Sequence, residues 1–179
     1  QGKVDFLKQP VTTGWMDLTI GKKATASSEK EGKPASLAAD HIIKTWWSAQ
    51  TGNVDEWLQI DLGKVYPVEA VQTNFADEKF PNRKEGNPAV PYKYMVEGSE
   101  DGNTWVTLVD KTANDVTNPH ALLVLDQAAN ARYVRITNKS ELPGQFSIYD
   151  LRVFGLDYGA KPEAVKSFNI ARTLDGRTA

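Results

Sequence analysis

Apolar and polar residues alternate along much of the chain, with the period expected of β-strands. From Trp57 to Leu62, the side chains of Leu58, Ile60 and Leu62 fall on one face and those of the intervening residues on the other. A period of two is typical of a strand with one buried face. Further apolar runs follow at even spacing, at residues 68–75, 92–98, 105–109, 121–125, 131–137 and 148–154. No segment has apolar residues at i, i+3, i+4 and i+7 over a length that would support a core helix. The pattern predicts an all-β antiparallel sandwich with little helix.

The same pattern divides the chain into one central domain and two flanking segments. Residues 1–14 show no clear period and are expected to be a linker from an upstream domain, whereas Met16 to Ser28 alternates and turns at Gly21, as a first strand would. We expect the central domain at residues 15–155. Residues 156–179 combine a Gly/Pro hinge with a new alternating stretch, which looks like the truncated start of a following fibronectin-like domain. Within the domain, residues 76–91 show no periodic pattern of apolar residues, and an insert of that length is usually functional or mobile.

Composition excludes several classes of function. The 179 residues carry 21 basic and 23 acidic side chains, a formal net charge of -2, so the chain lacks the basic field that nucleic-acid binding needs. The longest apolar run, residues 121–125, is far too short to span a bilayer. Cysteine is absent, which removes disulfides, thiolate metal sites and cysteine nucleophiles. We therefore expect neither a nucleic acid nor a membrane as partner.

The residues for independent catalysis are also missing. Glycoside hydrolysis needs two carboxyl groups facing each other across a sugar, one of them with a raised pKa. The adjacent acidic pairs, at residues 55–56, 77–78 and 100–101, all fall in predicted turns or loops, where solvent keeps both members ionised. The chain has only two histidines, His41 and His120, which is too few for a multi-histidine zinc site and leaves little basis for a histidine triad. Both are expected to have roles in loop structure. We expect this chain to be non-catalytic.

Oxygen ligands gather in the turn from Asp40 to Thr45. A carboxylate, a hydroxyl and several free backbone carbonyls lie within six residues there, which suits a hard cation. An Asx turn, in which the carboxylate of Asp40 caps its own backbone, explains the same residues equally well. The residue types leave both interpretations open.

Five motifs, in the right order along the chain, resemble those of discoidin-type domains. They are DHIIKTWW at 40–47, EWLQIDLG at 56–63, SEDGNTW at 99–105, ARYVRIT at 131–137 and YDLRVFG at 149–155. This group includes the family 32 carbohydrate-binding modules and the C domains of coagulation factors five and eight. The resemblance covers about residues 16–155 and implies a discoidin-like (galactose-binding-like) jelly roll. More narrowly, TWWSAQTGN, NFADE and ANDVTNPH are similar to the modules that follow the catalytic domain in bacterial family 43 glycoside hydrolases.

The resemblance implies a structural calcium site that joins the first loop to the last strand. The implied ligands are Asp40, Thr45 and Asp150, with backbone carbonyls near Leu37 and from Ile42 and Tyr149. Such a shell offers the six to eight oxygens that calcium prefers. The sequence departs from the family pattern at two positions: His41 replaces the usual Gly, and Ile42 replaces the usual second Asp, where a carbonyl ligand survives the change.

A sugar site is implied on the loops at the same end of the sandwich. Such a site needs an aromatic face for the apolar side of a pyranose and a few polar groups for its hydroxyls. The implied contacts are Trp46, Phe146, Asn74, Glu29 and Lys44. Packing beneath a loop is the alternative role for Trp46, and a half-buried position is the alternative for Phe146. Asn74 stands where galactose-type binders have Arg, which counts against galactose specificity. The tryptophans expected in the core are Trp47, Trp57 and Trp105.

These expectations combine into one functional hypothesis with two alternatives. We expect a monomeric, non-catalytic carbohydrate-binding module of an exported family 43-like xylosidase or arabinosidase. It would be secreted, periplasmic or on the cell surface, with polysaccharide or oligosaccharide and the parent's catalytic domain as partners. The alternatives are an interaction domain for protein or membrane surfaces, like the coagulation C domains, and a spacer that packs on its catalytic domain.

Overall fold

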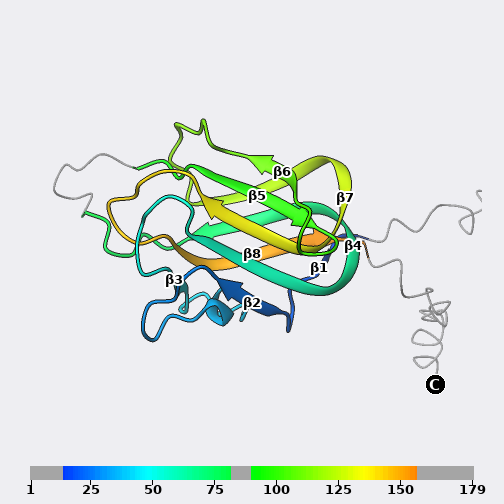
Figure 1. Cartoon of the computed structure of the whole chain (residues 1–179), viewed down its shortest axis with the longest axis horizontal. Coiled ribbons are helices and arrows are strands. Elements are labelled where there is room, and N and C mark those ends of the chain that lie inside the picture. The colour runs from blue at the N-terminus through cyan, green and yellow to red at the C-terminus, as the bar shows by residue number, and fades with distance from the viewer. Residues whose placement is uncertain (1–13, 82–89, 157–179) are drawn as a thin grey trace, which may run out of the picture.

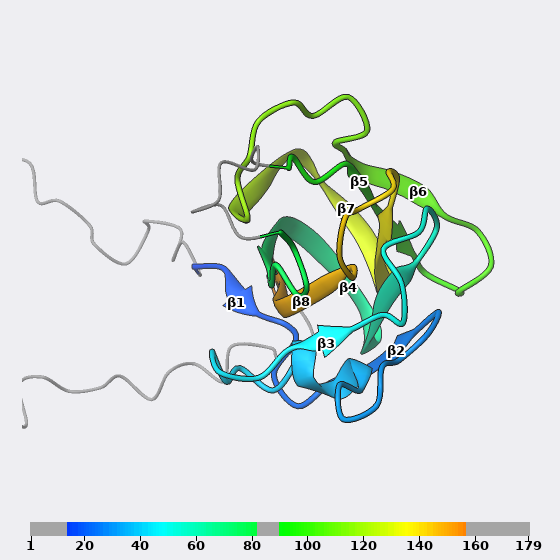
Figure 2. The same ribbon diagram turned by 90° about the vertical axis from the view of Figure 1, so that its left-hand side faces the viewer.

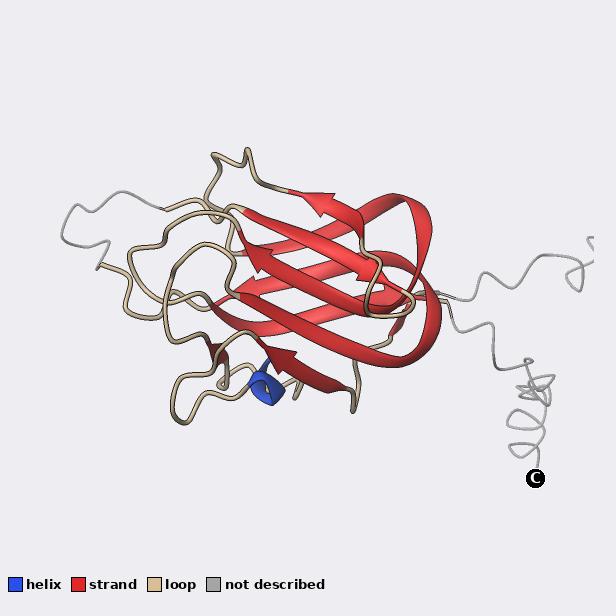
Figure 3. Cartoon of the chain, in the orientation of Figure 1, coloured by secondary structure: helices blue, strands red, loops and turns tan. Residues whose placement is uncertain are grey.

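The computed structural model describes residues 14–81 and 90–156, and their fold is all-β (Figures 1 and 3). A single turn of 3-10 helix, η2 (Ala35–Ala38), is the only helix in these two ranges. The strands are β1 (Met16–Asp17), β2 (Lys23–Ala26), β3 (Trp47–Ser48), β4 (Trp57–Phe75), β5 (Tyr94–Ser99), β6 (Val106–Asp110), β7 (His120–Asn138) and β8 (Ser147–Gly155). The predicted fold class is confirmed. The expected linker and following domain fall almost wholly on residues 1–13 and 157–179, outside the described residues.

Two long, bent strands hold the sheet together. β4 and β7 each have 19 residues, and each combines two runs that the sequence pattern predicts as separate strands. They pair antiparallel along both halves, from Trp57 opposite Thr137 to Asn74 opposite His120, with register shifts between Asp61 and Tyr66 and between Val68 and Ala70. Gly63 lies at the first shift with a φ of 86°, a conformation that glycine adopts without strain. The bends let one sheet fold back on itself as two layers (Figure 2).

The remaining strands extend each layer. The second half of β4 pairs with β8, which pairs with β1 and β3. The first half of β4 pairs with β2, and the second half of β7 pairs with β5, which pairs with β6. The end of β4 and the starts of β7 and β8 therefore meet at one end of the molecule. The bends of β4 and β7 lie at the opposite end, with β1 and the end of β8 (Figure 1).

The apolar face of each strand packs into one core. Leu58, Ile60 and Leu62 have no exposed surface, as the alternation predicts, and Trp47 is likewise fully buried. The prediction that Trp57 and Trp105 are core residues is wrong, because both are half-buried. Their rings lie 4.7 Å and 4.0 Å from the guanidinium of Arg135, on the outer side of the sheet. Each indole is covered by a cation and not by the interior. None of the described helical residues forms a segment long and apolar enough to cross a bilayer.

Candidate functional site

A cleft of about 340 Å³ lies at the end of the sandwich where β4 stops and β7 begins. Three aromatic residues line it, of which Trp46 and Tyr149 are half-buried and Phe75 is buried, together with polar side chains from two loops. Its full lining is Trp46, Phe75, Ala76, Asp77, Glu78, Pro119, His120 and Tyr149. Segments far apart in the sequence therefore build one cleft.

A β-bulge brings Tyr149 into the cleft. In the pairing of β4 with β8, Asn74 lies opposite Asp150 but Phe75 lies opposite Ile148, so Tyr149 has no partner residue on β4. A bulge of this kind redirects a side chain out of the regular alternation. The ring of Tyr149 meets that of Trp46 edge to face, with 5.5 Å between centroids and 69° between planes. Aromatic pairs favour this arrangement, and it fixes both rings at the wall of the cleft.

Contacts on several sides hold the indole of Trp46. Its Nε1–H donates to Oε2 of Glu78 at 2.5 Å, and the ammonium of Lys33 lies 2.9 Å from the ring centroid. The side chain is half-buried, so part of the ring is open to solvent. Lys33 does not line the cleft. The indole is thus fixed before any ligand arrives, which lowers the entropic cost of binding.

Glu78 accepts hydrogen bonds from several groups around Trp46. Its second carboxylate oxygen pairs with Nζ of Lys30, and its backbone carbonyl accepts from the amide of Gln145 at 3.0 Å. Burial alone would raise the pKa of the Glu78 carboxyl. Hydrogen bonds from Lys30 and Trp46 outweigh burial and hold that pKa below its ordinary value of 4.5. Glu78 is therefore an ionised acceptor at neutral pH.

His120 forms another wall of the cleft, at the first residue of β7. Its Nδ1 lies 3.2 Å from Oδ1 of Asn74, which faces it across the β4–β7 pair. The amide oxygen of Asn74 can only accept, so in the tautomer that hydrogen-bonds to it the proton is on Nδ1 and Nε2 is left as an acceptor.

The structure brings only part of the predicted sugar site together. Trp46 lines the cleft, and Asn74 contacts it through His120. Phe146 is fully buried, with its ring 5.7 Å from that of Trp47, so the expectation that it offers a face to a sugar is corrected. Its backbone pairs with Thr51 and Ala49 in the turn before β8, and that pairing directs the ring inward.

The two remaining predicted contacts lie away from the cleft. Glu29 is exposed, but its Oε1 accepts from the amide of Ala35 at 2.8 Å and so caps the 3-10 turn. Lys44 is exposed on the turn that follows Asp40 and does not line the cleft. Neither position supports a direct contact at this site.

Tyr149, Glu78 and His120 were not predicted as side-chain contacts for sugar. All three stand in motifs that carry the resemblance: Glu78 in NFADE at residues 74–78, His120 in ANDVTNPH at residues 113–120 and Tyr149 in YDLRVFG at residues 149–155. The motifs were thus a usable signal for all three positions. The side-chain role of Tyr149 depends on the bulge, which no local pattern reveals.

The turn at Asp40 forms the predicted Asx turn and also gathers several oxygen atoms. Oδ1 of Asp40 accepts from the amide of Ile42 at 2.8 Å, which is the Asx turn, and His41 has a φ of 61°. Oδ2 accepts from the hydroxyl of Thr45 at 2.7 Å, and that hydroxyl lies 2.9 Å from the carbonyl oxygen of Ile42. Three of the oxygens implied for calcium therefore converge at Thr45.

Asp150 lies near this turn on β8. Its side chain is 4% exposed, and Oδ1 is buried without a hydrogen-bond partner, while Oδ2 lies 3.2 Å from Nη2 of Arg152. Burial raises the pKa of the Asp150 carboxyl, and Arg152 offsets part of that rise. An unpartnered buried carboxylate oxygen close to an oxygen-rich turn fits a hard cation. In the described ranges, no three His, Cys, Asp or Glu side chains are grouped so as to hold a metal, so any such site depends on hydroxyl and carbonyl ligands.

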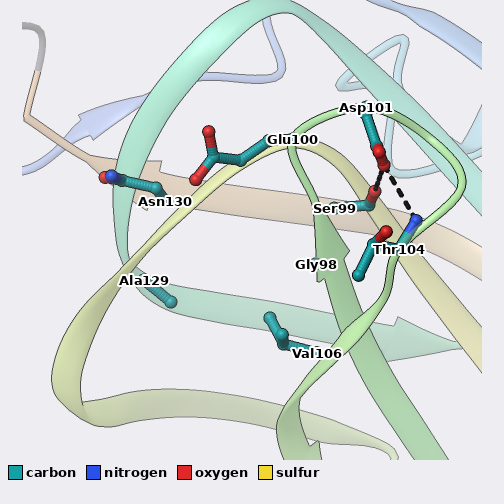
Figure 4. Close-up of a pocket in the computed structure, with 8 residues that line it drawn as sticks. All are labelled: Gly98, Ser99, Glu100, Asp101, Thr104, Val106, Ala129 and Asn130. Atoms are coloured by element: carbon teal, nitrogen blue, oxygen red, sulfur yellow. Dashed lines mark hydrogen bonds between the residues drawn. The ribbon is translucent and has the colours of Figure 1, made fainter.

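A larger hollow, of about 550 Å³, lies at the opposite end, beside the bends of β4 and β7 (Figure 4). Its lining is Gly98, Ser99, Glu100, Asp101, Thr104, Val106, Ala129 and Asn130. Asp101 is occupied within its own turn, where it accepts from the amide of Thr104 at 2.8 Å and from the hydroxyl of Ser99 at 3.1 Å. No aromatic ring lines this hollow, so it lacks a stacking surface for a sugar. The cleft at Trp46 is the better candidate despite its smaller size.

Comparisons with known proteins agree with this architecture. The family model of the F5/8 type C domain matches residues 23–151. Lactadherin of Bos taurus is 33% identical over 98 residues, which cover 50% of this chain and 22% of lactadherin. The chain thus matches only about a fifth of the length of this curated relative.

Two solved structures extend the comparison. Chitosan-binding module 1 from a chitosanase/glucanase of Paenibacillus sp. IK-5 is 26% identical, with a TM-score of 0.65, and the match covers 78% of this chain and 99% of the module. The family 32 carbohydrate-binding module of Clostridium perfringens NanJ, solved with galactose, is 22% identical, with a TM-score of 0.61 and coverage of 79% and 98%. The second match shows the fold alone. With a family model that spans most of its length, the chain belongs to the F5/8 type C domain family.

Proposed function

We propose that this chain is a non-catalytic carbohydrate-binding module whose site is the cleft at Trp46. The observation that carries the proposal is the fixed, half-exposed Trp46–Tyr149 pair at the wall of a cleft with polar side chains. Sugar recognition needs this combination of a ring for the apolar face of a pyranose and convergent polar groups for its hydroxyls. The similarity to a chitosan-binding module supports the same class of ligand.

In this proposal each polar group has a defined role. His120 offers a ring nitrogen. A carboxylate oxygen accepts more than one hydrogen bond, so in this proposal Asp77 and Glu78 accept from sugar hydroxyls in addition to their donors within the protein. The cleft is shallow and small, so few ligand atoms lose contact with water. We expect dissociation constants in the micromolar to millimolar range.

The two carboxylates of the cleft do not form a hydrolytic pair. A glycosidase needs one carboxyl with a raised pKa to protonate the leaving group. The pKa of Glu78 is held low by its hydrogen bonds from Lys30 and Trp46, although burial opposes them. Asp77 accepts from the hydroxyl of Tyr92 at 2.6 Å and is thereby engaged in loop packing. Binding without hydrolysis is the chemistry that this arrangement supports.

For the protein from which the module comes, we propose an exported glycoside hydrolase of the family 43 type. The support is the resemblance of three motifs in the sequence to modules of that family, and the origin of one structural neighbour in a chitosanase/glucanase. Tethering a catalytic domain to its polymer raises the effective concentration of substrate, so weak binding suffices.

We further propose that calcium binds at the turn of Asp40, with a structural role. The residues that would hold it are Asp40, Thr45 and Asp150, with the carbonyl of Ile42. The orphaned Oδ1 of Asp150 is the observation in favour. Calcium supplies positive charge that compensates the buried carboxylate and joins the turn to β8.

A second candidate function is binding to a membrane or protein surface. One observation favours it: Ile42 and Ile43 are 52% and 76% exposed on the turn, beside Lys44. Exposed apolar side chains next to a base suit insertion at a lipid interface. Co-sedimentation with phosphatidylserine vesicles tests this function, and sedimentation that is lost in an Ile43→Ser variant would support it.

Affinity electrophoresis tests the carbohydrate hypothesis. The native chain, Trp46→Ala and Trp105→Ala are run in gels that contain xylan, arabinan, chitosan or galactan. Trp105 is a matched control, because it is also half-buried but lies on the sheet face near Arg135. We expect at least one polysaccharide to retard the native chain and Trp105→Ala but not Trp46→Ala. Equal migration of all three in every gel would contradict the proposal.

A further inference from the structure

A second hollow adjoins the cleft along the start of β7. It also encloses about 340 Å³, and His120 lines both hollows. The segment between them is short, because Pro119 lines the cleft and Asn118 lines the second hollow. Small-molecule sites usually enclose about 300 to 1,000 Å³, so each hollow alone is at the lower limit of that range. The two hollows together match a ligand longer than one sugar ring.

An unpaired strand edge makes the second hollow accessible. Residues 120–124 of β7 pair with β4 on one side, whereas β5 pairs only with residues 133–138 of β7. In the described ranges, no strand covers the other side of the first half of β7. The loop between β6 and β7 flanks that edge with Lys111, Asn114 and Val116.

The second hollow has both kinds of surface that a pyranose needs. Val116 and Leu122 are 62% and 55% exposed, and they offer apolar contact to the C–H face of a sugar. Lys111 and Asn118 supply polar groups at its margin. The buried side chain of Tyr94 also lines the hollow. This surface is weaker than an aromatic platform, as expected of an auxiliary subsite.

Hydrogen bonds fix the flanking loop in place. The side-chain amide of Asn114 donates to the carbonyls of Tyr92 and Val116, each at 2.9 Å. At the junction, the amide of His120 lies 3.3 Å from Oδ1 of Asn118, and its ring contacts Asn74. The junction is therefore ordered on both sides before a ligand binds.

We propose that the two hollows are consecutive subsites of one groove that passes over His120. The ligand class is then an oligosaccharide or polysaccharide segment of at least two sugar units, and not a single terminal sugar. The stacking subsite holds one unit against Trp46 and Tyr149, and the second subsite holds the next unit against Leu122 and Val116. This inference rests on the proposed carbohydrate function.

Isothermal titration calorimetry with ligands of increasing length tests the groove. The probes are xylose, xylobiose and xylotriose, with glucosamine, chitobiose and chitotriose as a second series. We expect affinity to rise roughly five- to tenfold or more from one unit to two in the series that binds, a gain of about 1 to 1.4 kcal/mol. Leu122→Ser is expected to remove most of this gain and leave binding of the single sugar unchanged.

Val124→Ser is the matched control. Val124 is 58% exposed on the same strand, two residues from Leu122, and it does not line the groove. Both side chains are on the surface, so neither change threatens the core. If one unit and three units bind equally well, or if both serine variants behave alike, the second subsite is refuted while the stacking site stands. If neither series binds and no polysaccharide retards the chain, the carbohydrate function itself fails, and the groove fails with it.

Discussion

Removing the carboxylate of Glu78 should test whether a pre-fixed indole matters for binding. Glu78→Ala leaves Nε1–H of Trp46 without its acceptor at 2.5 Å and Lys30 without its ion partner. Hydrogen bonds to charged groups contribute about 1.5 to 3 kcal/mol each when buried. The side chains of Lys30 and Glu78 are 30% and 12% exposed, so solvent reduces that contribution. We expect a combined loss of about 1 to 2 kcal/mol of unfolding free energy, or roughly 3 to 8 °C in Tm.

Two further variants separate the indole contact from the ion pair. Glu78→Gln keeps a carbonyl acceptor for Trp46 but removes the charge that pairs with Lys30, so it should lose stability and retain most binding. Glu100→Ala is the control, because Glu100 is an exposed glutamate at the opposite end of the sandwich. Calorimetric melting gives the stability, and affinity electrophoresis gives the binding. The reasoning is refuted if Glu78→Ala melts and binds like the native chain.

The pH dependence of the same variants gives an independent check. The pKa of Glu78 is lower in the folded chain than its ordinary value of 4.5, because hydrogen bonds from Lys30 and Trp46 outweigh the effect of burial. The stability that the carboxylate contributes is therefore complete above pH 4.5 and is lost as the pH falls through the lower folded value. The difference in Tm between the native chain and Glu78→Gln should shrink in acid. A difference that stays constant from pH 7 to pH 3 would contradict this.

Two further substitutions and the addition of calcium test contacts that stabilise the sandwich and the loops around the cleft. Arg135→Lys should lower the free energy of unfolding in urea by about 1 to 2 kcal/mol, since lysine lacks the planar guanidinium that lies 4.7 Å from the ring of Trp57 and 4.0 Å from that of Trp105. Native-like stability would show that these contacts are incidental. In Gly144→Ala, the new Cβ would lie 2.3 Å from the carbonyl oxygen of Glu78, so the loop must move. We expect a loss of more than about 2 kcal/mol of unfolding free energy and weaker polysaccharide binding. An unchanged melting temperature would disprove the close packing. Calcium should raise the Tm of the native chain and not that of Asp150→Asn, and an equal response of both would remove Asp150 from the proposed site.

The strand pattern was predictable because it is local. Leu58, Ile60 and Leu62 alternate with polar residues, and the structure buries all three. The joining of two predicted runs into one bent strand was not predictable, since it depends on pairing between β4 and β7 across the whole molecule. The register shifts at the bends are likewise properties of the pair and not of either strand.

The site was predictable only where a family motif marks it. The motif marks Trp46 as a predicted sugar contact, and the structure places Trp46 in the lining of the cleft. The motif cannot place Phe146, whose ring turns into the core. Glu78 reaches Trp46 across 32 positions of sequence, a contact that only the fold creates. The alternation with Leu58 already puts Trp57 on the outer face of its strand, and the expectation that it is a core residue overlooked this. The contacts of Trp57 and Trp105 with Arg135 depend on strand pairing, so sequence patterns do not reveal them.

A series of ¹H–¹⁵N correlation NMR spectra that follows the tryptophan indole N–H signals is the most direct test of whether sugar binds in the cleft. The chain has five tryptophans, and the Trp46→Ala variant assigns the signal of Trp46. During titration with chitotriose or xylotriose, the indole N–H signal of Trp46 should shift progressively, because the proposal places the sugar against its ring and its proton is bonded to Glu78. The signals of Trp57 and Trp105, which lie near Arg135 on the sheet face, should stay in place. Shifts at those two signals with none at Trp46 would place the ligand elsewhere and overturn the account.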